Sequence, residues 1–273
     1  MIWCKIPFIP AESSKFIWMI YGNPNAKSES NGNAVFELFN VQGIKAFWHF
    51  DELQWTGATG EVKDETGVNY GTAYGGATTT SDAVYGRAGY FDGEDDYVEV
   101  LDNDSLDITD EITVEVWLKH FSRTDPNPRI VVKQPVNDAY LIWFENANDR
   151  IGFRIKRESD LAQNTAFASH IPDSLWHYFV GTYDGTDIKI YKDGVLKETV
   201  NFPGTIHTTD GNLVIGGKQD GNQQFNGIID EVRIWERALT PTEIEILYNN
   251  YMQKMGSYFN VRKYVTPAPV VIV

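Results

Sequence analysis

Cysteine is nearly absent from this sequence: Cys4 is the only one in 273 residues, so no disulfide can form within the chain. Histidine is also scarce, and none of the five has the spacing typical of zinc ligands: His49, His120, His170, His177 and His207. No apolar run approaches the roughly 20 residues that a membrane-spanning helix needs. We therefore expect no thiol chemistry, no zinc centre and no membrane span in this chain.

Positive charge is in short supply. The chain has 23 basic and 38 acidic residues, which gives a formal net charge of −15. A field of this sign repels nucleic-acid phosphates and anionic lipid surfaces, so nucleic acid is not an expected partner. Surplus carboxylates suit hard cations such as Ca²⁺, although most surface acids serve only to solvate the protein.

Short alternating segments dominate the chain from about residue 44. Hydrophobic residues make up 42% of the sequence, which is enough for a substantial core. Residues 112–119, 150–157 and 176–198 alternate apolar and polar side chains, as strands do. Asp-Gly pairs recur between such segments and suit tight hairpin turns, the clearest being "IKIYKDGVLKE" at 188–198. Only 239–252 predicts a helix, with Thr240, Pro241 and Glu243 at its start.

Four motifs resemble one family when they are taken together in order. They are "AFWHFDE…VKDETGVNYGTAYGG" (46–76), "GRAGYFDGEDDYVEV" (86–100), "ITVEVWLK" (112–119) with "WHYFVGTYDGTDIKIYKDGVL", and "NGIIDEVRIWERALTPTEIEIL" (226–247). Residues 44–252 are similar to a laminin G-like jelly roll of the concanavalin A-like lectin and glucanase superfamily. The resemblance implies an all-β fold, a two-sheet antiparallel β-sandwich with one short C-terminal helix.

The flanks of this region have a different character. Residues 1–43 resemble part of a prokaryotic surface-protein module of unknown function, present either as a partial module or as added strands. Residues 253–273 are expected to form an extended connector, because prolines space the stretch "RKYVTPAP". We expect an extracellular or cell-surface location within a larger exported protein whose signal lies outside this chain, since residues 1–14 have neither a basic region nor a continuous apolar stretch.

The resemblance also implies a structural Ca²⁺ that joins the last strand to the first turns. Its aspartate maps onto Asp230, and its other oxygen donors map onto the regions of Asp51, Asp92 and Gly93. Mixed carbonyl and carboxylate oxygens are the shell that Ca²⁺ prefers. The alternative is that Asp230 only accepts backbone N–H bonds at the entry to its strand.

Simple alternation separates the two adjacent acids of "IIDEVRIW". It places Asp230 on the face of Val232 and Ile234, where a buried carboxylate needs a cation or several donors. It places Glu231 on the opposite face with Arg233. We therefore interpret Glu231 as one half of a surface ion pair rather than a metal ligand.

Two further stretches are rich in acids. Asp92, Glu94, Asp95 and Asp96 crowd one turn, and their mutual repulsion would be relieved either by a shared metal or by solvent. The acidic stretch 102–111 is expected to be a solvated loop.

Aromatic residues suggest a carbohydrate ligand, because jelly rolls present a concave sheet on which sugar rings can stack. Trp143 and Phe144 are the candidates; they must face opposite sides of their strand, and either could instead fill the core. The Glu-x-Asp-x-x-Glu pattern of glucanases on this fold is absent, so we expect no catalysis. The sequence predicts a non-catalytic recognition or adhesion module that binds a glycan or another cell-surface component. Alternatives are an architectural or protein-binding module, or an accessory domain of a glycan-degrading enzyme.

Overall fold

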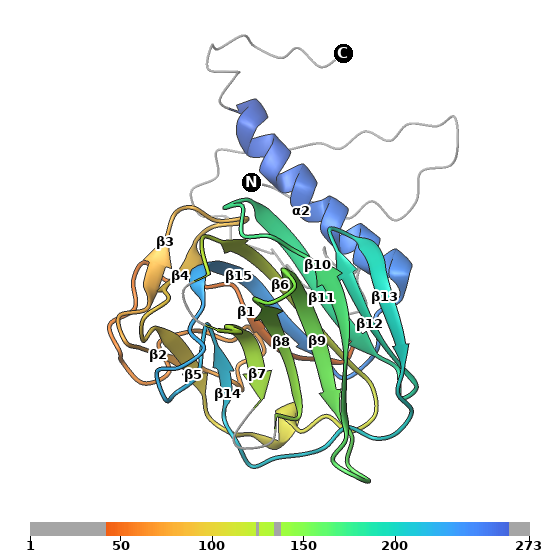
Figure 1. Cartoon of the computed structure of the whole chain (residues 1–273). Helices are drawn as coiled ribbons and strands as arrows, with labels where there is room; N and C mark the ends of the chain where they lie inside the picture. The colour runs from red at the N-terminus through yellow and green to blue at the C-terminus, as the bar shows by residue number, and fades with distance from the viewer. Residues whose placement is uncertain (1–41, 124–125, 134–137, 262–273) are drawn as a thin grey trace, which may run out of the picture. The chain divides into compact units, whose positions relative to one another are not determined.

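A computed structural model describes residues 42–123, 126–133 and 138–261, with side chains of the last helix up to residue 252. The expected N-terminal module, residues 1–43, falls almost entirely outside the described residues. The described part is a β-sandwich of two antiparallel sheets with a helix along one side (Figure 1). The all-β prediction from the alternating segments is confirmed.

The first sheet, sheet A, has the strand order β13-β12-β11-β6-β15-β4-β3, and β1 also pairs with β15. Its strands are β13 (Val195–Asn201), β12 (Asp187–Lys192), β11 (Trp176–Tyr183), β6 (Ile112–His120), β15 (Asn226–Trp235), β4 (Ala88–Asp92), β3 (Thr78–Thr80) and β1 (Ile44–Trp48).

The second sheet, sheet B, has the order β10-β9-β8-β7-β14-β5-β2. Its strands are β10 (Gln163–Ser169), β9 (Arg150–Lys156), β8 (Tyr140–Glu145), β7 (Arg129–Lys133), β14 (Leu213–Ile215), β5 (Tyr97–Val100) and β2 (Gly71–Tyr74). A short 3₁₀ helix, η1 (Asp104–Leu106), lies between β5 and β6.

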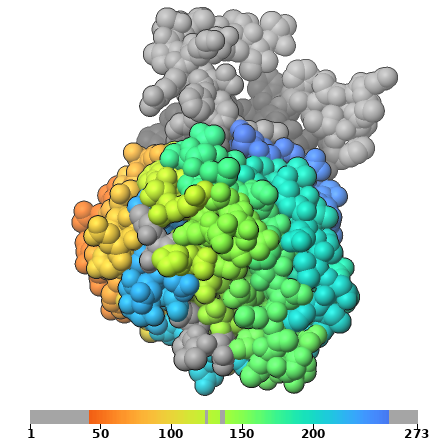
Figure 2. All heavy atoms as spheres, viewed as in Figure 1, coloured from red at the N-terminus to blue at the C-terminus, as the bar shows by residue number. Residues whose placement is uncertain are grey.

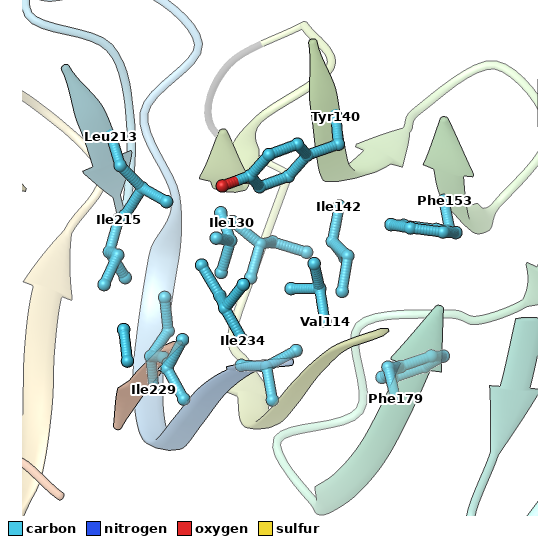
Figure 3. Packing of buried hydrophobic residues seen from close by; sticks show 14 of the residues in the cluster. Val114, Ile130, Tyr140, Ile142, Phe153, Phe179, Leu213, Ile215, Ile229 and Ile234 are labelled. Carbon is cyan, nitrogen blue, oxygen red and sulfur yellow. The ribbon is translucent and has the colours of Figure 1, made fainter. Parts of the chain in front are cut away.

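The core lies between the inner faces of the two sheets (Figure 3). Every second residue of β6 points into it, which is the alternation that residues 112–119 predict. Phe153 of β9 packs directly over Gly181 of β11, where a Cβ atom would overlap the aromatic ring. Gly181 therefore lets the two sheets approach at this point.

The predicted hairpin at 188–198 is also confirmed. Strands β12 and β13 pair antiparallel and are joined at Asp193 and Gly194. Both residues have positive φ, 53° and 77°, as a two-residue turn that matches the twist of its strands requires.

The only helix among the described residues outside η1 is α2 (Pro241–Val261). It begins with the predicted capping box: Thr240 N–H donates to Glu243 Oε2 at 2.7 Å, and Glu243 N–H donates to Thr240 Oγ1 at 3.3 Å. The helix continues to Val261, so the expectation of an extended connector from residue 253 is wrong for residues 253–261. This stretch contains no proline, and its residues Gln253, Lys254 and Met255 favour helix. Residues 262–273 lie outside the described residues.

Candidate functional site

A β-bulge in β15 decides where the two adjacent acids point. Asp230 is opposite Trp117 of β6 and Arg233 is opposite Glu115, so β15 has one residue more than β6 between these two pairs. Glu231 takes the extra position, with φ of 52°. The prediction that Asp230 and Glu231 face opposite sides is therefore wrong, because the bulge turns both away from the core face.

Asp230 is completely buried even so, because the loop before β4 covers it. Its Oδ2 atom accepts the backbone N–H groups of Val84 at 2.8 Å and Tyr85 at 3.2 Å. Its Oδ1 atom is buried and has no hydrogen-bond partner within the described residues. Burial, reinforced by the neighbouring Glu231 carboxylate, raises the pKa of Asp230 well above its usual range. This Oδ1 atom therefore has the burial and the free lone pairs that a cation ligand needs.

Asp51 lies at the same loop. Its Oδ1 atom accepts the backbone N–H of Arg87 at 2.6 Å, and a Cβ atom on Gly86 would overlap the carboxylate. Burial raises the pKa of Asp51, and Glu231 is one of the nearby charges that raise it further. Residues 84–87 therefore donate backbone N–H groups to both carboxylates, those of Val84 and Tyr85 to Asp230 and that of Arg87 to Asp51. This is the juxtaposition of first turn and last strand that the calcium hypothesis requires.

Asp92 and Gly93 lie elsewhere. Asp92 at the end of β4 is opposite Asn226, four residues before Asp230 along β15. At about 3.3 Å per strand residue, this offset is roughly 13 Å. One metal ion shared between Gly93 and Asp230 is therefore excluded, and the predicted ligand set divides into two separate places.

The second place is the turn between β4 and β5. The carboxylates of Asp92, Asp95 and Asp96 each offer an oxygen within 4.8 Å of the others. Asp96 is only 2% exposed, and its Oδ1 atom has no hydrogen-bond partner in the part of the chain that the structure describes. Burial raises the pKa of Asp96 to about 6, and the charges of Asp92 and Asp95 add to this rise.

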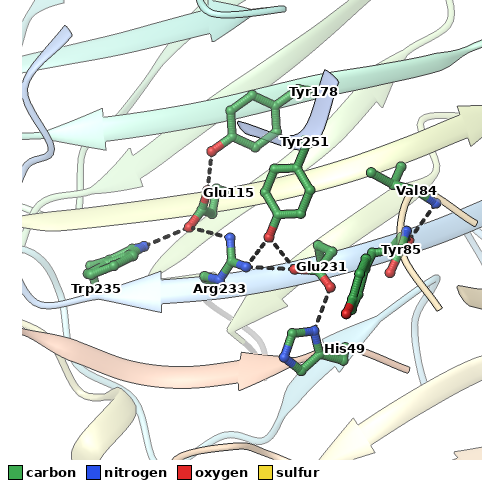
Figure 4. A network of polar contacts seen from close by, with 10 residues as sticks. His49, Val84, Tyr85, Glu115, Tyr178, Glu231, Arg233, Trp235 and Tyr251 are labelled. Atoms are coloured by element: carbon green, nitrogen blue, oxygen red, sulfur yellow. Dashed lines mark hydrogen bonds and ion pairs between the residues drawn. The ribbon is translucent and has the colours of Figure 1, made fainter. Parts of the chain in front are cut away.

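A buried polar network occupies the outer face of sheet A (Figure 4). Arg233 is at its centre: it donates to Glu231 at 2.6 Å and to Glu115 at 3.3 Å. The remaining partners close the network around these three: Tyr251 contacts Arg233 and Glu231, His49 contacts Glu231, and Tyr178 and Trp235 donate to Glu115.

Glu231 therefore belongs to an ion pair with Arg233, but the pair is not at the surface, since Glu231 is 1% exposed. Although burial alone would raise the pKa of Glu231, Arg233 and His49 hold it below its usual value. Helix α2 is the reason for the burial. Its Tyr248 ring stacks on Trp117 with centroids 5.8 Å apart, and its Tyr251 reaches the network.

Glu115 is a member of this network that was not predicted from the sequence. Alternation in β6 places it opposite the core face, where a solvated position is the ordinary expectation. The available signal was Trp117 on that same face, together with an amphipathic helix that needs an apolar surface to cover. A helix that packs on Trp117 necessarily covers Glu115 as well.

The acidic stretch 102–111 is not wholly solvated either. The ammonium group of Lys133, which is fully buried, forms ion pairs with Asp102 and Asp107 and donates to the Gly211 carbonyl at 2.8 Å. Two of these acids thus balance a buried charge of sheet B.

Trp143 and Phe144 point in opposite directions, as expected for neighbours in a strand. Phe144 points into the core, where its ring lies 4.6 Å from that of His120, so it cannot contact a ligand at the surface. Trp143 lies on the outer face of sheet B but is only 6% exposed. The guanidinium groups of Arg154 and Arg129 lie over its ring, 4.7 and 5.3 Å from the centroid.

Trp143 is part of a band of aromatic side chains across this face, which we call the aromatic band: Tyr74, Tyr97, Trp143 and Phe167. Tyr74 and Tyr97 stack with centroids 5.0 Å apart, and Tyr74 is 40% exposed. A hollow of about 370 Å³ adjoins Tyr74 and is lined also by Trp55 and the Gly75–Gly76 turn. The green and yellow-green segments that include β7 to β10 form much of the surface visible in Figure 2.

Comparison with known protein families gives two matches. A family model described as the concanavalin A-like lectin/glucanases superfamily matches residues 92–245. A second model, a domain of unknown function (DUF2341), matches residues 1–58 and so extends through β1. Among curated proteins, the human adhesion G-protein coupled receptor D1 is 27% identical over 138 residues. That alignment covers 48% of this chain but only 15% of the receptor.

Solved structures share the fold at low identity. The binding domain of Paraclostridial Mosquitocidal Protein 1 superposes with a TM-score of 0.61 at 15% identity, over 77% of this chain and 52% of that one. Domain 4 of AbnA, an extracellular GH43 arabinanase from Geobacillus stearothermophilus, was solved with arabinotriose. It superposes with a TM-score of 0.58 at 21% identity, over 76% of this chain and 98% of that one. A third structure is that of botulinum neurotoxin type C, a toxin whose cell entry depends on interaction with two ganglioside molecules. It superposes with a TM-score of 0.57 at 17% identity, over 73% of this chain and 51% of that one.

The helices within the described part of the chain include none with the length and hydrophobicity needed to cross a bilayer.

Proposed function

The chain belongs to the concanavalin A-like lectin/glucanase superfamily, whose model matches more than half of its length, and we propose that it is a non-catalytic recognition or adhesion module of an extracellular protein. Its proposed ligand is a carbohydrate, and its proposed cofactor is one structural Ca²⁺ at Asp230. Folds of this kind host lectins, adhesion modules and enzymes, so the proposal depends on the surface of this chain rather than on the fold.

The aromatic band on the outer face of sheet B is the observation that carries the proposal. Aromatic rings stack on the apolar faces of sugars, and polar groups beside them fix orientation. Tyr74 offers an exposed ring beside the hollow, and Phe167 is flanked by the guanidinium of Arg150, 3.5 Å from its ring centroid. Trp143 is buried under the guanidinium groups of Arg129 and Arg154, so it packs against the other rings of the band rather than facing solvent. Relatives of the same fold include an arabinanase domain solved with arabinotriose and toxin domains that bind receptors, which supports a recognition role.

Two buried glutamates among the described residues, Glu115 and Glu231, are engaged in a way that does not suit glycoside hydrolysis. Hydrolysis requires two carboxyl groups that face the substrate about 5 to 9.5 Å apart. Glu115 and Glu231 are close in space, but both are buried beneath α2 and tied to Arg233. They serve the attachment of the helix, and we propose a binding module rather than an enzyme.

Calcium fits the residues at Asp230. The Oδ1 atom of this buried aspartate and the Asp51 carboxylate, which contacts the same loop, would hold the ion together with oxygens of that loop. When bound, the ion would supply the positive charge that a buried carboxylate needs. It would thereby fasten residues 84–87 to the last strand.

Binding to immobilised polysaccharides, neutral and acidic, tests the proposed function. We expect retention on at least one glycan, with Tyr74→Ala and Phe167→Ala each weakening binding by about tenfold, the order of one lost aromatic contact. Tyr90→Ala is the matched control, because Tyr90 is similarly exposed but lies on β4 of sheet A. If the full panel is blank, the architectural or protein-binding alternative replaces this proposal. If Tyr90→Ala is as harmful as Tyr74→Ala, the aromatic band is not the binding surface.

A further inference from the structure

The turn between β4 and β5 crosses from sheet A to sheet B. It packs against a second crossover, the Gly75–Gly76 turn between β2 and β3, so closely that a Cβ atom on Gly75 would overlap the Asp95 carbonyl. Both turns therefore close the same edge of the sandwich. Whatever holds the first turn in place also holds the edge strands of both sheets.

Three carboxylates converge in the first turn. Asp92, Asp95 and Asp96 present oxygens within 4.8 Å of one another, although like charges at this distance repel. Within the described residues, no lysine or arginine forms an ion pair with any of the three. The backbone supplies some compensation, since Asp92 accepts the Glu94 N–H at 2.8 Å and Asp96 accepts the Asp92 N–H at 2.9 Å.

Asp96 supplies the independent observation. It is buried, and none of the described residues donates a hydrogen bond to its Oδ1 atom. A buried carboxylate oxygen without a donor is costly, and solvent cannot relieve it as it can relieve the exposed Asp95. The Gly76 position faces this atom, because a Cβ there would lie 3.3 Å from Oδ1.

We propose that this turn is a second Ca²⁺ site, with the carboxylates of Asp92, Asp95 and Asp96 as ligands, separate from the site proposed at Asp230. The donor set consists of oxygens alone, which favours a hard cation over zinc or copper. The two sites are roughly 13 Å apart along β15, so the ions bind as independent neighbours rather than as a pair that shares a ligand.

A cation in this turn would fasten the edge of the sandwich beside the aromatic band. The Gly75–Gly76 turn that packs on Asp95 and Asp96 also lines the hollow next to Tyr74. Loading the turn would therefore limit the movement of one wall of that hollow. The proposal does not depend on whether the hollow binds a sugar.

Equilibrium dialysis of the full chain against Ca²⁺, after the protein has been stripped with chelator, tests the site by stoichiometry. We expect Asp95→Asn to lose one bound ion relative to the parent, and Asp230→Asn to lose a different one, so that the double variant binds neither. Asp95 is exposed, so its substitution leaves the fold intact; Asp96→Asn, checked by circular dichroism, should behave in the same way. Glu94→Gln is the matched control, because it removes an equal charge from the same turn but lies outside the ligand set.

The possible results separate the two sites. An Asp95→Asn variant that binds as many ions as the parent overturns the second site and leaves the site at Asp230 unaffected. Loss of an ion in Glu94→Gln as well as in Asp95→Asn also overturns it, because the turn would then act only through its total charge. A loss in Asp95→Asn with none in Asp230→Asn supports this site and removes the one at Asp230.

Discussion

Arg233 donates a hydrogen bond to Glu231 at 2.6 Å, two residues back along the same strand, and both side chains are buried under helix α2. A buried guanidinium between two carboxylates, those of Glu231 and Glu115, is a costly arrangement to disturb because each partner depends on the others for its charge balance.

Replacing Arg233 by methionine should therefore destabilise the fold strongly. The change leaves two buried carboxylates without their cation, and we expect a loss of roughly 3 to 5 kcal/mol in the free energy of unfolding. Chemical denaturation measures it. Lys189→Met is the control: Lys189 pairs with Asp184 at a partly exposed position, where such a pair contributes about 1 kcal/mol or less. Equal effects of the two substitutions would show that the network is not the support of α2.

Calcium should raise the melting temperature through Asp230. An ion that binds only the folded state stabilises it by mass action, so calcium at about a hundredfold above its Kd should add about 5 to 10 °C. Asp230→Asn and Asp51→Asn should lose the part of this rise that comes from the site at Asp230, and only the part that comes from the second proposed site should remain. Asp210→Asn, an exposed aspartate in another loop, should keep the whole rise. An identical rise in the parent and in Asp230→Asn would place the stabilising ion elsewhere.

Acid should weaken the fold through two buried histidines. Burial lowers the pKa of His120 to about 4 and that of His170 to about 3. The charges of Arg123, near His120, and of Lys192, near His170, contribute to this lowering of the pKa, whereas Asp173 opposes it at both histidines. Because the unfolded chain takes up these protons near pH 6.5 and the folded chain does not, stability falls as pH decreases from about 6.5 towards 4.

The slope is at most about 1.4 kcal/mol per pH unit for each histidine, so on the order of 2 kcal/mol per histidine is lost at pH 5. Denaturation of His170→Phe at pH 7 and pH 5 checks this. The His170 ring already lies among aromatic neighbours, and its two nitrogens have no hydrogen-bond partner among the described residues, so phenylalanine should fit. The variant should lose less stability than the parent between these two pH values; an unchanged difference would mean that His170 does not titrate in this window.

Gly181 should tolerate no side chain while Phe153 is present. Gly181→Ala places a methyl group where the Phe153 ring lies, and overpacking of this kind costs about 1 to 3 kcal/mol. Because the conflict is between two particular groups, Gly181→Ala combined with Phe153→Leu should cost less than the sum of the separate changes. Additive losses in a double-mutant cycle would show that the glycine is needed for another reason.

Much of the fold could be predicted because its signals are local. The period-2 alternation of residues 112–119 defines which side of β6 enters the core, and Asp193–Gly194 specifies a hairpin by its backbone preferences. The capping box at Thr240 likewise depends on residues three apart. The end of α2 was less predictable, because the stretch after residue 252 has no strong stop signal before its prolines.

The candidate site was predicted only in part. Asp230 was identified as a buried acid, but the argument from alternation failed at the bulge, which inserts Glu231 and turns both acids to the same side. Asp92 and Gly93 were grouped with Asp230 although β4 and β15 hold them about four residues apart in register. Strand register is set by long-range pairing and cannot be read from either segment alone.

The sequence by itself therefore determined the class of fold, the strands and turns, the one capped helix and the abundance of carboxylates, because these depend on neighbours along the chain. Only the tertiary structure decided which carboxylates meet. It brought Asp51 and Asp230 to one loop, separated them from the Asp92 turn, and buried Glu115 and Glu231 beneath α2. The physical reason is that burial and charge compensation depend on contacts between segments far apart in the chain, as in the hydrogen bond between His49 and Glu231, which are 182 residues apart.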